Sequence, residues 1–178
     1  MPDWPFPWGA ATARVGSVGK KRSLMHARLS RRPTYRSPRI WKTATAALRQ
    51  IGLVGASIED ASGNPTAPIY PFELAVERVR AAVEAARSLD FPFTLCARAE
   101  TFLHGRSDLS DTLRRLQAYA DVGADVLYAP GLTTRQQIIA VVQAVAPKPV
   151  SVLVGIAGLQ LSLVGLAEIG VRRVSLGS

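Results

Sequence analysis

The sequence has little of three features that define broad classes of protein: cysteine, long apolar runs, and acidic residues near its start. It contains one cysteine, Cys96, in 178 residues, which excludes an internal disulfide framework and a metal site built from cysteines. Cys96 lies in an apolar stretch, and we expect a buried, inert thiol. No apolar run approaches the roughly 20 residues needed to cross a bilayer, so we expect a cytoplasmic protein without a membrane partner.

Acidic residues are almost absent from the first 50 positions. Residues 1–50 contain 11 Lys and Arg and one acid, Asp3, whereas residues 51–178 contain 11 Lys and Arg and 12 Asp and Glu. The first segment also holds all three tryptophans and lacks sustained helical or strand periodicity. Such a composition cannot bury enough apolar surface to offset the entropy lost on ordering. We therefore expect residues 1–42 to be a disordered basic segment.

The basic stretch at residues 20–42 leaves several interpretations open. Its Lys and Arg side chains are suited to phosphate contacts with nucleic acid or to a membrane surface. An Arg-rich, acid-poor start is also typical of a transit peptide. We favour a solvated tail without a role of its own, and we do not expect nucleic acid as a partner.

Residues 43–178 have a regular pattern of a different kind. Gly52, Gly123 and Gly170 each follow a helical stretch and precede a short apolar strand, as expected for glycine at a left-handed helix cap. Two more apolar strands, residues 93–97 and 150–154, follow prolines. This alternation predicts right-handed βαβ units, and hence a parallel α/β sheet of about five strands with both faces covered.

The predicted helices also carry capping and surface signals. Ser110 is the expected N-cap of a helix over residues 111–120, and Thr133 or Thr134 caps one over 135–145. Four arginines fall on helical stretches and are expected to lie on the solvated surface: Arg78, Arg80, Arg114 and Arg115.

Polar side chains follow the ends of two predicted strands. Glu59 and Asp60 end the first strand, and Arg98 and Glu100 end the second. Because parallel strands place their carboxyl ends at one edge, these side chains should meet there. Acids facing an arginine suit a divalent cation with an anionic substrate, because Mg²⁺ prefers oxygen ligands and Arg grips carboxylates. Equally simple alternatives are a loop start or cap for the two acids and a structural ion pair for Arg98.

Three further residues belong to this candidate site. Ser57 and Ser151 lie on the first and fourth predicted strands and are expected to contact substrate. His104 follows the second strand as an accessory candidate, although a loop or packing histidine explains it as well. Spacing alone shows neither a phosphate-binding glycine loop nor a nucleophile with its base. The residues thus predict an anion-binding site, with a metal as a further possibility.

Several runs together resemble the isocitrate lyase/phosphoenolpyruvate mutase superfamily from about residue 46 to 178. The matching runs are GLVGASIED at 52–60, FELAVERVRAA at 72–82, ARAETFLHG at 97–105, LQAYADVGADVLYAPG at 116–131 and RRVSLGS at 172–178. The resemblance implies part of a TIM-type (β/α) barrel, with the five strands as its fourth to eighth. It also implies an enzyme acting on C–C or P–C bonds of small 2-oxo or hydroxy carboxylic acids, and homo-oligomers among intact relatives.

The resemblance assigns roles to two of the candidate residues. It implies Mg²⁺ as cofactor, with Glu59 in the metal shell through water and Arg98 holding the substrate's carboxylate or phosphonate. The chain departs from the family in lacking counterparts of the first three strands, with their main metal-binding acids, and in the loop at residues 61–66. We therefore expect an activity impaired by truncation, with an inactive remnant of such an enzyme as the alternative.

The codons for residues 41–45, Trp-Lys-Thr-Ala-Thr, suggest an origin for the atypical start. Read one base earlier, they can encode Leu-Glu-Asn-Gly-Tyr, which resembles the family's acidic motif. Our hypothesis is that residues 1–45 are a frameshifted reading of the missing barrel segment. The nucleotide sequence of the gene tests it, since the alternate frame must encode barrel-like sequence upstream.

Overall fold

The computed structural model describes residues 53–155 and 161–176, all within the unit Pro33–Ser178. The predicted disorder of residues 1–42 and the predicted cap at Gly52 lie outside these ranges. Strands and helices alternate along the described chain. In order, they are β1 (Gly55–Glu59), α2 (Phe72–Arg87), β2 (Thr94–Arg98), α3 (Leu109–Asp121), β3 (Val126–Tyr128), α4 (Arg135–Val145), β4 (Val150–Val154), α5 (Leu163–Glu168) and β5 (Arg173–Leu176).

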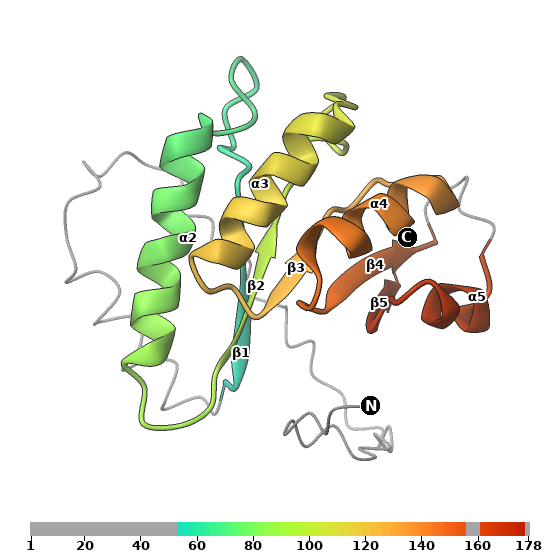
Figure 1. The fold of residues 1–178 in the computed structure, drawn as a ribbon. Coiled ribbons are helices and arrows are strands. Elements are labelled where there is room, and N and C mark those ends of the chain that lie inside the picture. The colour runs from blue at the N-terminus through green and yellow to red at the C-terminus, as the bar shows by residue number, and fades with distance from the viewer. Residues whose placement is uncertain (1–52, 156–160, 177–178) are drawn as a thin grey trace, which may run out of the picture. The chain divides into compact units, whose positions relative to one another are not determined.

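The strands form one parallel sheet in the order β1-β2-β3-β4-β5. Sequence order equals spatial order, and a helix follows each of the first four strands, which is the repeat of a (β/α) barrel. Helices α2, α3 and α4 cover one face of the sheet (Figure 1). The predicted partial TIM-type barrel with five parallel strands is confirmed.

The core lies between this face of the sheet and the helices. One row of registered strand residues, Ile58, Ala97, Leu127 and Val150, is buried and belongs to the core cluster. We call it the apolar row. Helix residues of the same cluster include Val79, Ala82, Leu116, Tyr119, Ile138 and Val141. Each fully buried aliphatic side chain of this kind contributes about 1.5–3 kcal/mol to folding.

Glycine and capping residues fix where the helices end. Gly123 and Gly170 have φ values of +105° and +91°, so the predicted left-handed caps are confirmed at both positions. Thr134 caps α4 through a complete capping box with Gln137, as one of the two predicted threonines. The prediction for Ser110 is wrong, because α3 begins at Leu109 and Asp108 accepts a hydrogen bond from the Asp111 amide at 3.0 Å.

The two outer strands are less buried than the prediction of two covered faces implied. Most side chains of β1 and β5 are exposed or half-buried, whereas the centre of β2 and the start of β4 are buried. Within residues 53–155 and 161–176, β1 and β5 each have a neighbouring strand on one side only. In the same ranges, no helix is long and apolar enough to span a membrane.

Candidate functional site

A second row of registered residues lies on the opposite face of the sheet from the core. Parallel register joins Glu59 to Arg98, Arg98 to Tyr128, Tyr128 to Ser151, and Ser151 to Arg173. Side chains alternate between the two faces along a strand, so these residues share the face opposite the apolar row. We call Glu59, Arg98, Tyr128, Ser151 and Arg173 the polar row.

Arg98 lies at the end of β2 and is held by neighbours on three sides. Its Nε donates to Glu100 Oε1 at 2.6 Å, and its Nη1 lies 3.8 Å from Glu59 Oε2. Its guanidinium carbon lies 5.1 Å from the centre of the Tyr128 ring, a cation–π distance. The side chain is 21% exposed. Its terminal nitrogens make no hydrogen bond to another described residue, so one edge of the guanidinium can accept an anion.

The charges around Arg98 are strongly coupled. Burial lowers the pKa of Arg98, but the carboxylates of Glu100 and Glu59 outweigh burial and raise it above its ordinary value. Burial raises the pKa of Glu100, Glu59 and Asp60 raise it further, and Arg98 only partly offsets them. Arg98 therefore stays charged, while Glu100 protonates more readily than an ordinary glutamate. The predicted alternative of a structural ion pair with Glu59 or Glu100 is thus present in the same geometry.

Asp60 and Glu59 are neighbours in sequence but have opposite surroundings. Asp60 is 2% exposed. Its Oδ1 accepts from the Glu100 amide at 2.8 Å, and its Oδ2 accepts from Tyr119 at 2.9 Å and Arg115 at 3.2 Å. The side chain of Glu59 is 45% exposed, and its one ion pair with another described residue is the long contact to Arg98. Glu59 is therefore open to a ligand, whereas Asp60 has both oxygens occupied by the protein.

The expectation that Arg115 is a solvated surface residue is wrong. It is 4% exposed and forms a buried ion pair with Asp60, and its Nε also donates to Asp111 at 2.8 Å. Arg80 and Arg114 are exposed as expected, and Arg114 stacks on Phe72. Arg78 is half-buried over the ring of Tyr70. Helical spacing did not reveal the buried partner of Arg115, which lies on another element.

The other predicted site residues lie in different places. Ser57 is exposed on β1, on the face of the polar row and two residues before Glu59. Ser151 is 1% exposed, and its hydroxyl has no hydrogen-bond partner among the described residues. His104 is exposed in the turn after β2 and has no side-chain contact to Arg98 in the described chain. The structure thus brings Ser151 into the polar row and leaves His104 outside it.

Two polar residues for which the sequence predicted no role also lie on this face of the sheet. Arg173 is exposed at the start of β5 and is the second cation of the polar row. Ser175, two residues later, hydrogen-bonds the Tyr128 hydroxyl at 3.2 Å. Polar positions alternating along an otherwise apolar strand were the available signal, since such alternation marks two different faces.

Cys96 is a buried residue on the same face of the sheet as the polar row. It lies two residues before Arg98 on β2 and is 6% exposed. Burial raises the pKa of its thiol to about 11, although the charges of Arg173 and Arg98 favour the thiolate. The predicted buried thiol is confirmed.

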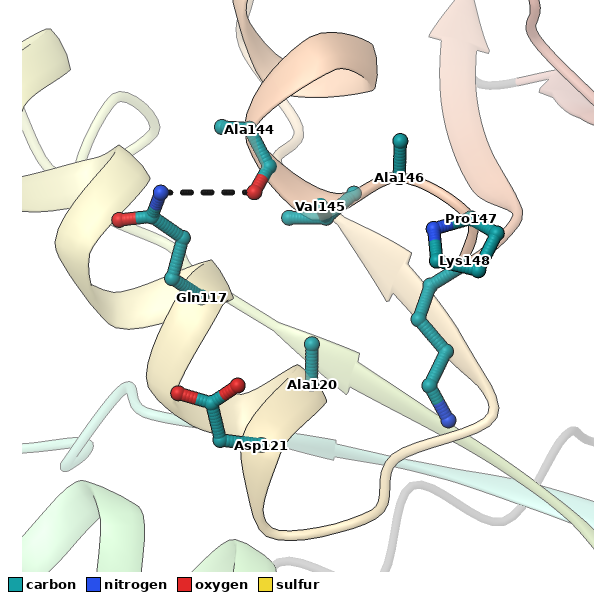
Figure 2. Close-up of a pocket in the computed structure, with 8 residues that line it drawn as sticks. All are labelled: Gln117, Ala120, Asp121, Ala144, Val145, Ala146, Pro147 and Lys148. Carbon is teal, nitrogen blue, oxygen red and sulfur yellow. Dashed lines mark hydrogen bonds between the residues drawn. The ribbon is translucent and has the colours of Figure 1, made fainter.

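A groove elsewhere on the molecule contains none of the predicted site residues. It lies where the C-terminal ends of α3 and α4 meet, and Gln117 donates to the Ala144 carbonyl at 3.4 Å across it (Figure 2). The groove is lined by Gln117, Ala120, Asp121, Ala144, Val145, Ala146, Pro147 and Lys148. These residues lie near the start of β4, whereas the Arg98 site lies at the carboxyl end of β2. The predicted ligand-binding residues Glu59, Arg98 and Ser151 therefore lie on the polar row and not in this groove.

The carboxylates of the described chain do not fit a complete magnesium site. No group of three or more His, Cys, Asp or Glu side chains lies close enough together in residues 53–155 and 161–176 to hold a metal ion. Asp60 is saturated by protein donors, and Glu100 is buried against Arg98. Glu59 is the one open carboxylate at the Arg98 site, and a single carboxylate is too little for an all-protein site.

The amino-acid sequence of the chain matches a known protein family. A family model for phosphoenolpyruvate phosphomutase matches residues 34–178. The chain belongs to the phosphoenolpyruvate phosphomutase family. This confirms the resemblance to the isocitrate lyase/phosphoenolpyruvate mutase superfamily, and the match begins upstream of the expected start near residue 46. No curated protein sequence matches the chain.

Solved structures of other proteins resemble the chain. A proposed lyase/mutase from Burkholderia cenocepacia J2315 is 54% identical over 77% of this chain and 50% of its own, with a TM-score of 0.72. A proposed phosphonomutase from the same organism is 33% identical over 79% of this chain and 58% of its own, with a TM-score of 0.66. Oxaloacetate acetylhydrolase in complex with its product oxalate is 26% identical over 80% of this chain and 50% of its own, with a TM-score of 0.68. The chain therefore spans about half the length of these relatives.

Proposed function

We propose that this phosphoenolpyruvate phosphomutase family chain carries the anion-binding part of an active site. That site acts on C–C or P–C bonds of small 2-oxo or hydroxy carboxylic acids. The observation that carries the proposal is the geometry of Arg98, whose Nε is held by Glu100 while its terminal nitrogens make no hydrogen bond to another described residue. Similar structures include a proposed lyase/mutase, a proposed phosphonomutase and an enzyme whose product is oxalate, which supports a carboxylate or phosphonate as the ligand.

Binding follows from the chemistry of the polar row. The planar guanidinium of Arg98 can donate two parallel hydrogen bonds to a carboxylate or to a phosphonate oxygen pair. The incoming anion replaces the long 3.8 Å contact to Glu59 and leaves the short bond to Glu100 intact. Ser151, two strands away, offers a buried hydroxyl that has no hydrogen-bond partner in residues 53–155 and 161–176. A hydroxyl of this kind gains a hydrogen bond when a ligand oxygen arrives.

We propose Mg²⁺ as the cofactor of the complete site, with Glu59 facing the ion through a water molecule. The exposed carboxylate of Glu59 beside the anion-binding arginine supports this assignment. The described carboxylates do not form the rest of the metal shell, so no catalytic step of this chain is assigned to the metal. An inactive remnant that still binds the anion is the second candidate, and the incomplete metal shell favours it.

Calorimetric titration of the purified chain with oxalate, with and without magnesium chloride, tests the anion site. We expect Arg98→Gln to weaken oxalate binding by about 2–5 kcal/mol, because an open charged donor is lost. Arg80→Gln removes the same charge from an exposed position on α2 and should leave the dissociation constant unchanged. Equal binding by the parent chain and Arg98→Gln would refute the proposal.

Turnover assays separate an enzyme from a remnant. We expect the chain to bind oxalate and to show C–C or P–C bond cleavage only weakly with Mg²⁺. Binding without any turnover, and without stabilisation by Mg²⁺, would instead establish the remnant. The nucleic-acid or membrane-surface alternative concerns residues 20–42, which lie outside the described residues, and it requires salt-sensitive binding that survives deletion of residues 43–178.

We also propose a homo-oligomer, as expected for intact relatives. Parallel strands with one open side, as β1 and β5 have in the described chain, are ready to pair with another chain. Sedimentation over a range of protein concentrations tests it, and a monomer at all concentrations would exclude it.

A further inference from the structure

We infer that Asp60 is a positioning residue which, with Arg115 and Tyr119, fixes the segment that carries Arg98 and Glu100. The affinity of Arg98 for an anion then depends on three side chains that never touch the ligand. The inference rests on the proposed role of Arg98, and its test is designed so that either can fail alone.

Asp60 connects three elements through hydrogen bonds. Its amide donates to the Arg98 carbonyl at 3.3 Å, and its Oδ1 accepts from the Glu100 amide at 2.8 Å. Its Oδ2 accepts from Tyr119 and Arg115, both on α3. The end of β1 thereby holds the end of β2 and the middle of α3 in one arrangement.

Burial together with occupied hydrogen-bonding atoms excludes a direct ligand role for this network. Asp60, Arg115 and Tyr119 are 2%, 4% and 0% exposed. Arg115 also donates to the Tyr70 carbonyl at 3.1 Å and to Asp111, so its donors are distributed over several elements. A buried charge in a low dielectric requires such partners, and loss of one partner leaves the others uncompensated. The network can therefore act on a ligand only through the residues it holds.

The route from Asp60 to the guanidinium runs through Glu100. Asp60 fixes the backbone of Glu100, and the Glu100 carboxylate in turn holds Arg98 Nε at 2.6 Å. Rotation of Glu100 would release Nε and let Arg98 turn toward Glu59, which is now 3.8 Å away. An arginine bound to Glu59 would present fewer donors to an anion. Asp60 thus selects between two arrangements of Arg98.

A second contact makes α3 a rigid support for this segment. The hydroxyls of Thr101 and Thr112 share a hydrogen bond of 2.6 Å, and both residues are fully buried. The turn after β2 is therefore tied to α3 both through Thr101 and through the Asp60 network. A change confined to one hydroxyl of the network should shift the segment without unfolding the helix.

Tyr119→Phe is the primary test, because it removes one hydroxyl and keeps the buried ring. We expect oxalate to bind about tenfold more weakly, as coupled residues in one network typically show. We also expect the Arg98 Nε–H signal in nitrogen NMR to move and to exchange faster with solvent. Ser88→Ala removes a hydroxyl from the exposed end of α2 and should change neither reading.

The Arg98→Lys background identifies the route of the effect. Lysine keeps the charge but lacks the Nε–H that Glu100 holds, so Tyr119→Phe should cause little further loss of oxalate affinity there. A loss of the same size in both backgrounds, or an unchanged dissociation constant and Nε–H signal in Tyr119→Phe, overturns the inference. If Arg98→Gln itself binds oxalate normally, the proposed function fails instead. Should Tyr119→Phe not fold, Asp60→Asn takes its place in both measurements with the same expectations.

Discussion

The two faces of the sheet have opposite chemistry although they are built from adjacent residues. The apolar row of Ile58, Ala97, Leu127 and Val150 packs under the helices, and a residue of the polar row follows one position later on each of these four strands. Both rows are drawn from the same short strands. Side chains alternate between the two faces along each strand. One set of residues therefore packs in the core and stabilises the fold, while the other set is available to bind a ligand.

One buried polar cluster interrupts the apolar side. Asp60, Arg115 and Tyr119 lie among helix-facing residues, yet Asp60 also accepts a hydrogen bond from the backbone amide of Glu100, beside the polar row. The two faces are therefore independent in composition but mechanically connected at the ends of β1 and β2. Changes to each face should separate stability from binding, except at this cluster.

The largest loss of stability is expected from Arg115→Gln. Removing one partner of a buried ion pair leaves Asp60 uncompensated and should lower the free energy of unfolding by about 3–5 kcal/mol. Arg114→Gln changes the neighbouring arginine, which is exposed over Phe72, and should cost about 0.5 kcal/mol. Urea unfolding followed by circular dichroism measures both. Similar losses for the two variants would contradict the buried role of Arg115.

The next largest loss is expected within the apolar row. Leu127→Ala removes a fully buried side chain and should cost about 2–5 kcal/mol. Val126→Ala changes the residue before it, which faces the other side of β3 and is half-buried, and should cost about 1 kcal/mol. The same unfolding experiment compares them. A larger loss from Val126→Ala would reverse our assignment of the two faces.

Ser151→Ala should weaken ligand binding without lowering the stability of the fold. The buried hydroxyl has no partner in the described chain, so its removal should leave stability unchanged or raise it by about 1 kcal/mol. Oxalate binding should nevertheless weaken, because a ligand oxygen loses its donor. Thermal unfolding and oxalate titration test the two halves separately, and an unchanged dissociation constant would remove Ser151 from the site.

The smallest effect concerns the ionisation of Cys96. Burial raises the pKa of its thiol from an ordinary value of 9.0 to about 11. The folded state thus retains a proton that the unfolded state releases, and this contribution to stability is complete below pH 9 and declines as the pH rises toward 11. Cys96→Ala should remove that decline. Iodoacetamide should label the folded thiol slowly at pH 9, and labelling at the rate of an unfolded chain would show that Cys96 is not buried.

The sequence predicted features that depend on neighbouring residues. The helix ends at Gly123 and Gly170 follow from local backbone geometry, and the site of Arg98 follows from its place at a strand end. Ser110 was the wrong cap because Asp108, two residues earlier, competes for the same backbone amides.

Features that depend on distant residues were not predicted. The burial of Arg115 requires Asp60, which lies 55 positions earlier, and no helical pattern contains that information. Arg173 joined the polar row only through the register of β5 against β4. The saturation of Asp60 also needed the fold, because its sequence neighbour Glu59 has the same chemistry and remains open.

Ionisation of the Tyr119 hydroxyl can be followed by absorbance and reports whether the protein is folded. Burial raises the pKa of Tyr119 far above the ordinary value for tyrosine, and the charge of Asp60 and the hydrogen bond to it raise it further. In an alkaline titration Tyr119, one of four tyrosines in the sequence, should contribute no tyrosinate absorbance until the chain unfolds. The delayed tyrosinate absorbance would then report, without any label, the moment at which β1, β2 and α3 come apart.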